Sequence, residues 1–265
     1  MMQFTLRSAV RFSICVLVGA ALSHAARSAE RPVPVAGPAV GAGNAAYRDA
    51  KLPIEQRVKD LLGRMTLEEK IEQLTQKDAS GIVIQGNEAD PASLEKLFHD
   101  RSPGVLCAHF GDDLHQSAVR LAAGQRYLRE RTRLGIPALT VNEGLHGVLA
   151  QGATIYPQFL ALGCSWNPAL AEQMGSQIAE EATAAGINHL LTPMIEVVRD
   201  PRWGRVEECI GESPFLVGRM CSAYTLGIQG DLRTKPLATK KALAMLKTFA
   251  PTACRLTASI LPTAF

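Results

Sequence analysis

The spacing of apolar residues along this chain predicts helices that alternate with short strands. Apolar side chains recurring every three or four positions predict helices at residues 52–65, from Thr66 onward, 113–133, 167–185 and 214–229. Three of these helices start at residues that can cap them, namely Thr66 with Glu69 three positions later, Asp112 or Asp113, and Asn167 followed by proline. Short apolar runs predict strands at residues 81–85, 104–109, 136–142 and 188–193.

The same spacing predicts which side chains form the apolar face of each helix. The residues that share a face are Ile54, Val58, Leu61, Leu62 and Met65; Leu67, Ile71 and Leu74; Leu114, Ala118, Leu121, Ala122 and Leu128; Leu170, Met174 and Ile178; and Leu216, Met220, Tyr224 and Ile228.

Short apolar strands separated by helices of this length indicate parallel β-strand–helix units. Doubly wound sheets and barrels both contain such units. A nucleotide-binding doubly wound sheet usually carries G-x-G-x-x-G after its first strand, but the comparable glycines, at residues 37–43, precede every predicted strand. No phosphate-binding P-loop occurs either. The pattern therefore favours a (β/α) barrel, in which polar groups gather at the carboxyl ends of the strands.

The two ends of the chain differ from its body. Residues 1–29 combine arginines, an apolar run at 12–22 and small residues, which is the layout of a secretory signal peptide. That run is too short to span a bilayer, which takes roughly 20 residues, and no second run is longer. We therefore expect an exported protein, secreted or periplasmic, with no membrane partner. Residues 30–46, rich in Pro, Gly and Ala, are expected to form a linker or an extended arm.

Charge and cysteine content exclude further classes of protein. The net charge of +3 includes three positive charges in residues 1–29 and six after Asp231, which leaves −6 for residues 30–231. Such a body lacks the basic surface of a nucleic-acid-binding protein, so no nucleic-acid partner is expected. Five widely spaced cysteines follow the signal peptide. They suggest small buried side chains rather than a disulfide framework, although one bridge remains possible.

Two segments place polar groups at predicted strand ends. The first, residues 140–147, delivers Glu143 directly after an apolar strand, with Gly144 allowing close backbone approach. The second, residues 197–211, concentrates arginines and acids around Trp203. Arginine and carboxylate groups bind sugar hydroxyls and an indole covers an apolar sugar face, so these segments are consistent with a sugar site. Taken singly, each also fits a simpler interpretation, a turn with a solvated glutamate or a salt-bridged loop.

Other candidate chemistry is weaker. His109, Asp112, Asp113 and His115 could suggest a metal site, but two histidines six positions apart are not a standard ligand spacing. No G-x-S-x-G or H-E-x-x-H motif appears. We therefore expect no metal and no cofactor.

Four segments, at residues 47–74, 136–147, 153–170 and 191–216, resemble the N-terminal barrel domain of glycoside hydrolase family 3. That family contains β-glucosidases and β-xylosidases. The resemblance covers roughly residues 47–231, and its most specific parts are D-P-R-W-G-R-V-E-E at 200–208 and its spacing from N-E-G-L-H-G at 142–147.

The resemblance implies a (β/α)8 TIM-like barrel and a retaining mechanism acting on a β-linked oligosaccharide or glycoside. It places Glu143 and Arg205 on the hydroxyls of the sugar at the non-reducing end, and Lys247 on the same sugar. Trp203, Arg202 and Glu208 match residues that shape this loop, and His146 is assigned a structural role.

The chain also departs from the family pattern. Thr248 stands where a histidine follows the sugar-binding lysine, and Ser213 replaces an aspartate. No aspartate follows Asp231, so the nucleophile is not expected in this chain. The acid/base, which the family usually supplies from a following α/β domain or loop, is not expected either, and no catalytic residue is assigned. Residues 251–265 resemble nothing in the family.

We interpret residues 47–247 as a partial barrel, incomplete at its C-terminal end, followed by an aberrant tail at 248–265 produced by a frameshift or early stop. A barrel with half to two-thirds of its strands should have open edges and be poorly stable and prone to aggregation. Two functions remain open on this interpretation: an exported glycosidase, or a catalytically inactive fragment that binds sugar weakly.

Overall fold

The computed structural model describes residues 45–234, 236–238 and 240–249. The predicted signal peptide, residues 30–44 of the predicted arm and residues 250–265 of the predicted tail lie outside the described residues. No helix in the described part of the chain is long and apolar enough to cross a membrane.

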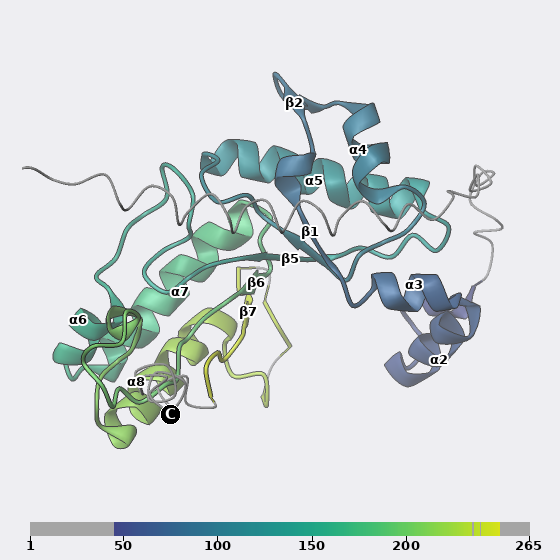
Figure 1. Cartoon of the computed structure of the whole chain (residues 1–265). Helices are drawn as coiled ribbons and strands as arrows, with labels where there is room; N and C mark the ends of the chain where they lie inside the picture. The colour runs from purple at the N-terminus through teal and green to yellow at the C-terminus, as the bar shows by residue number, and fades with distance from the viewer. Residues whose placement is uncertain (1–44, 235, 239, 250–265) are drawn as a thin grey trace, which may run out of the picture. The chain divides into compact units, whose positions relative to one another are not determined.

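Five parallel strands form the central sheet, in the order β1, β4, β5, β6, β7 (Figure 1). Their bounds are Gln76–Asp78, Val105–Cys107, Leu139–Asn142, His189–Leu190 and Leu243–Ala244. Within the described ranges, β1 and β7 each pair with one neighbour only, so the sheet is open rather than closed on itself. The predicted α/β fold with an incomplete barrel is confirmed, and five strands fall within the expected half to two-thirds of an eight-stranded barrel.

The strand predicted at residues 81–85 is not part of this sheet. The segment instead contains the 3₁₀ helix η2 (Ala79–Gly81) and strand β2 (Ile84–Gln85), which pairs antiparallel with β3 (Glu88–Ala89). The first strand of the parallel sheet is β1, whose sequence Gln-Lys-Asp carries no apolar residue. The apolar run was misleading because Ile82 is buried in the core although it lies outside any strand. Only Ile84 and Gln85 pair, and their partner is β3.

The helices begin close to where their caps predict. Their bounds are α2 Ile54–Arg64, α3 Leu67–Glu72, α4 Pro91–Phe98, α5 Leu114–Arg131, α6 Phe159–Cys164, α7 Pro168–Ala184 and α8 Pro214–Gln229, with 3₁₀ helices η1 Ala46–Arg48 and η3 Val206–Glu208. Thr66 and Glu69 form the predicted capping box. Asp113, not Asp112, caps α5 by accepting a hydrogen bond from the Gln116 amide, and Asn167 caps α7. Helices α4 and α6 were not predicted.

The predicted apolar faces are buried in only part of the molecule. Met174 and Ile178 of α7 and Met220, Tyr224 and Ile228 of α8 lie in the core, as predicted. Leu170 and Ala122 are exposed instead. The larger error concerns α2, α3 and the turn after α3, where Ile54, Val58, Leu62, Leu67, Ile71 and Leu74 are all exposed, because no element of the described chain covers them. Of the same predicted faces, Met65 is buried and Leu61 is half-buried.

Four cysteines fall within the described residues, and all four are free thiols. Cys107, Cys209 and Cys221 are buried, which confirms the interpretation of most cysteines as small core residues, whereas Cys164 is exposed. Burial raises the pKa of the Cys209 and Cys221 thiols to about 12, so both are inert at neutral pH. The remaining cysteine, Cys254, lies outside the described residues.

Candidate functional site

The functional candidates come together at the carboxyl edge of the parallel sheet. Glu143 directly follows β5, and Lys247 lies three residues beyond β7. Arg205 and Glu208 lie in the long connection between β6 and α8. Because the carboxyl ends of parallel strands meet at one edge of a sheet, residues far apart in the sequence converge there (Figure 1).

A chain of charge contacts links these four side chains. Lys247 Nζ donates to Glu143 Oε2 at 2.9 Å and lies 3.9 Å from Glu208 Oε2. The Arg205 guanidinium donates from Nε and a terminal nitrogen to the two carboxylate oxygens of Glu208, at 2.5 and 2.6 Å. Two cations and two carboxylates therefore form one network, with Lys247 placed between the two acids.

A pocket of about 270 Å³ opens beside this network. Its lining includes Glu143, Arg205 and Glu208, which the sequence analysis assigned to sugar binding. Lys247 does not line the pocket itself, but its ion pair with Glu143 places it next to a residue that does. The carboxyl group of Glu143 and the guanidinium of Arg205 thus face one cavity.

The electrostatics of the network keep Glu208 ionised. The hydrogen bonds from Arg205 lower the pKa of Glu208; burial opposes this shift, and the charges of Arg205, Lys247 and His146 reinforce it. The same pairing with Glu208 raises the pKa of Arg205. Glu208 therefore keeps its negative charge and its pairing with Arg205 down to mildly acidic pH.

Buried polar contacts fix the backbone that presents Glu143. The Glu143 amide donates to Asn142 Oδ1 at 2.6 Å, and Asn142 itself is fully buried. The Tyr224 hydroxyl donates to the carbonyl oxygen of Gly144. A side chain at Gly144 would crowd Leu190 and Thr192, which explains the glycine at this position. Helix α8 and strand β6 thus hold the residue that follows Glu143.

Besides Lys247, two predicted site residues do not line the pocket. Trp203 is only 7% exposed and belongs to the hydrophobic core, so its indole does not present a face to the cavity. Arg202 is exposed and forms a bidentate ion pair with Asp200, at 2.9 and 2.7 Å. Neither residue lines the pocket. Trp203 packs into the core and so anchors the loop that carries Arg205. This role accounts for an aromatic residue there without any sugar contact.

The pocket also contains residues to which the sequence analysis gave no binding role. His146, to which it gave a structural role, lines the cavity, and so do Leu145, Gln158 and Glu207. Gln158 immediately precedes α6, in a segment whose resemblance to the family could have pointed to it. For His146, its place three residues after Glu143 was the available signal.

The four side chains considered for a metal site each contact a different partner. His109 lies 3.5 Å from Asp78, Asp112 pairs with Arg120 at 2.6 Å, Asp113 caps α5, and His115 lies 3.2 Å from Asn87 Oδ1. Within residues 45–249, apart from the two gaps, no group of three or more His, Cys, Asp or Glu side chains could hold a metal ion.

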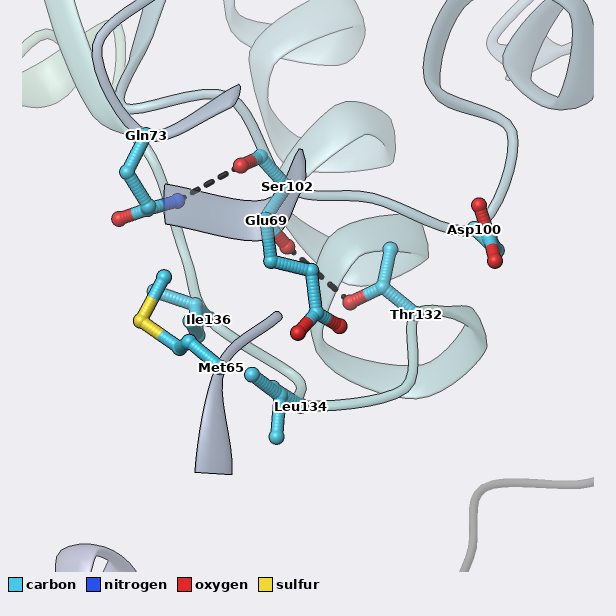
Figure 2. A pocket seen from close by; sticks show the side chains of 8 residues that line it. All are labelled: Met65, Glu69, Gln73, Asp100, Ser102, Thr132, Leu134 and Ile136. Atoms are coloured by element: carbon cyan, nitrogen blue, oxygen red, sulfur yellow. Dashed lines mark hydrogen bonds between the residues drawn. The ribbon is translucent and has the colours of Figure 1, made fainter. Parts of the chain in front are cut away.

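A second cavity, between α3 and the segment that follows α5, is too small to be a ligand site. Figure 2 shows its lining, in which Gln73, Ser102 and Thr132 are joined by hydrogen bonds. Its volume of about 10 Å³ is that of a single water molecule at most. It is a packing defect along a polar contact.

Comparison with known proteins shows which chains this one is similar to. The chain is 35% identical to a putative β-xylosidase of Formosa agariphila over 198 residues, which are 70% of this chain and 25% of that protein. It is 29% identical to β-glucosidase C of Emericella nidulans, over 73% of this chain and 32% of the relative. A solved β-glucosidase from Erythrobacter marinus superposes with a TM-score of 0.65 at 32% identity, covering 77% of this chain and 27% of that one.

The chain thus spans about a quarter to a third of the length of these relatives. The family model described as the N-terminal domain of glycosyl hydrolase family 3 matches residues 66–254, which include the strands, the connecting loop and the charged residues of the pocket. The chain therefore belongs to glycoside hydrolase family 3 and carries the N-terminal domain of that family.

Proposed function

We propose that the pocket lined by Glu143, Arg205 and Glu208 holds the sugar at the non-reducing end of a β-glucoside or β-xyloside. The observation that carries this proposal is the 2.9 Å contact between Lys247 Nζ and Glu143 Oε2, two residues 104 positions apart. It places a donor beside an acceptor for hydroxyl groups, and the acceptor Glu143 lines the cavity. The relatives named as β-xylosidase and β-glucosidase support this class of substrate.

The charged network suits the binding step of a retaining glycosidase. Glu143 and Glu208 accept hydrogen bonds from sugar hydroxyls, while Arg205 and Lys247 donate to them, so the ring is oriented at several points. Bond cleavage requires two further carboxyl groups, one as nucleophile and one as acid/base. We assign neither role to the residues of this pocket, and we propose that they bind sugar without hydrolysing it.

The signal-like residues 1–29 extend the proposal to location. An exported chain, secreted or periplasmic, would meet glycosides outside the cytoplasm. Expression with and without residues 1–29, followed by fractionation of medium, periplasm and cytoplasm, tests this point. Retention of the full chain in the cytoplasm would contradict export.

Sugar binding is tested by titrating the full chain with glucose and with xylose, and ligand-observed NMR detects the binding. We expect a dissociation constant of about 1 mM for at least one of the two sugars, equivalent to about 4 kcal/mol. Glu143→Gln should weaken binding at least tenfold. The matched control, Glu172→Gln on the exposed side of α7, should leave binding unchanged.

Unchanged sugar binding in Glu143→Gln would overturn the pocket assignment. Turnover is tested separately with aryl β-glucosides and β-xylosides, for which no hydrolysis is expected. Hydrolysis that disappears in Glu143→Ala would show an active glycosidase and contradict the non-catalytic part of the proposal.

A further inference from the structure

A second group of polar side chains lies at the same edge of the sheet, on the other side of Glu143 from Lys247. The strand register aligns Asp78 with Cys107 and Cys107 with Val141. Aligned residues of parallel strands point to the same face, and every second residue returns to that face. His109 and Glu143 each follow the second aligned pair by two positions, just beyond the ends of β4 and β5, and so lie at the same carboxyl edge of neighbouring strands.

Electrostatics agree with this alignment. Burial raises the pKa of the Cys107 thiol to about 11, and the carboxylates of Asp78 and Glu143 add to the shift. Both acids are thus close enough to Cys107 to affect its ionisation, as the register requires. Asp78 and Glu143 flank the strand that leads to His109.

Asp78 and His109 form a solvent-accessible pair. His109 Nδ1 lies 3.5 Å from Asp78 Oδ1, and their side chains are 41% and 56% exposed, respectively. The next residue, Phe110, is 44% exposed, although a phenyl group is ordinarily buried. A carboxylate, an imidazole and an accessible aromatic ring thus lie at consecutive strand ends.

Hydrogen bonds tie the loop that carries His109 and Phe110 to the loop behind the pocket. Gln151 donates from its amide to the carbonyl of Asp112 at 2.9 Å and from Nε2 to the carbonyl of Gly111 at 2.8 Å. The Leu114 amide donates to the carbonyl of Gln151 at 3.1 Å. Since residues 145–147 and 149 of the second loop line the pocket, the first loop is fixed beside it.

We propose that Asp78, His109 and Phe110 form a second sugar subsite, which binds the unit joined to the terminal sugar. This inference rests on the proposed function of the pocket. A pocket of about 270 Å³ is smaller than the roughly 300–1,000 Å³ of sites for larger ligands, so it takes one ring and leaves the next outside. Asp78 and His109 bind hydroxyl groups of that outer ring, and Phe110 covers its apolar face.

The test compares a disaccharide with a monosaccharide on the full chain by ligand-observed NMR. Cellobiose and glucose form one pair, and xylobiose and xylose form the other. We expect His109→Ala, Phe110→Ala and Asp78→Asn each to raise the disaccharide dissociation constant by about five- to tenfold, as loss of one contact implies. The monosaccharide constant should change less than twofold.

The control variant is His115→Ala, which removes an exposed histidine near the same loop whose imidazole contacts Asn87. It should change neither constant, and circular dichroism spectra should show that all variants keep the fold. Equal losses for monosaccharide and disaccharide, or an unchanged disaccharide constant, would overturn the second subsite while leaving the pocket intact. Failure of the unaltered chain to bind either monosaccharide would instead overturn the proposed function, and the subsite with it.

Discussion

Helix pairs α7–α8 and α2–α3 have similar apolar stripes but use them differently. In α7 and α8 the stripe lies in the core, and the two helices run side by side (Figure 1). Their close approach depends on Gly175 and Gly227, where a side chain would collide with backbone atoms of the facing helix. In α2 and α3 the apolar side chains at every third or fourth position face solvent.

Polar contacts, rather than the stripe, attach α2 and α3 to the rest of the described chain. Arg133 Nε donates to Glu69 Oε1 at 2.8 Å, and a terminal nitrogen of Arg133 donates to the carbonyl of Arg64. The Gln73 side chain donates to the carbonyl of Ser102 at 2.6 Å, beside the small cavity of Figure 2. This pair of helices is anchored by its ends and its capping box.

The comparison separates two properties that an apolar stripe is usually taken to predict together. The stripe predicts that a segment is helical, which holds for all four helices, and which of its faces is buried, which holds for α7 and α8 only. Whether the face is buried depends on a partner, and the residues described here supply one for α7 and α8 only. Stability should therefore respond very differently to the same substitution in the two pairs.

The largest difference is expected between Ile178→Ala in α7 and Ile71→Ala in α3. Ile178 is fully buried and its truncation should lower the free energy of unfolding by about 2–5 kcal/mol. Ile71 is 54% exposed, and its truncation should cost about 0.5 kcal/mol or less. Urea unfolding followed by the fluorescence of Trp203, which is buried, measures both. Similar losses in the two variants would mean that the α3 stripe is buried in solution.

The next effect concerns close packing within α8. Gly227→Ala places a methyl group against the backbone of α7 and should cost about 1–3 kcal/mol. Gly218→Ala, in the same helix, meets no atom within 4 Å and should gain about 0.5–1 kcal/mol from helix propensity. If both variants shift the urea midpoint in the same direction, the close contact between α7 and α8 is not as described.

A smaller effect is expected from the acid dependence of the α3 anchor. Burial disfavours the ionised form of Glu69, but hydrogen bonds from Arg133 and the Thr66 amide outweigh it and lower the pKa of Glu69. Its stabilising contribution is therefore complete above the unfolded value of about 4.3 and is lost as pH falls through the lower folded value.

Glu69→Gln should consequently flatten the fall in unfolding free energy between about pH 5 and pH 3, by roughly 0.2–1 kcal/mol. Urea unfolding of both proteins at a series of pH values measures the difference. Parallel curves for Glu69→Gln and the unaltered chain would show that the contact with Arg133 does not hold α3.

The smallest change in stability is expected where the α2–α3 stripe itself is made polar. The combined substitutions Ile54→Gln, Leu67→Gln and Leu74→Gln, all at exposed positions, should alter the free energy of unfolding by about 0.5 kcal/mol or less per residue. They should nevertheless raise the concentration at which the chain stays monomeric, because exposed apolar patches promote association. Sedimentation velocity measures the self-association. Unchanged self-association in the variant would mean that another surface of the chain mediates it.

Local signals in the sequence were enough to predict much of the fold. The capping residues Thr66, Asp113 and Asn167 predict helix starts because a cap satisfies backbone amides within a few positions of itself. The position of Glu143 at a strand end follows from the apolar run before it. Helix α4 and strand β1 were missed, since β1 has no apolar residue and owes its place to pairing with β4.

For the candidate site, the sequence by itself determined the chemical types that gather at the sheet edge and, through its resemblance to the family, Glu143, Arg205, Glu208 and Lys247. Only the tertiary structure decided that Lys247 contacts Glu143, that Trp203 lies in the core, and that His146 lines the pocket. The physical reason is range: propensity and capping act between neighbours in the chain. Burial and ion pairing depend on residues brought together from more than 100 positions away.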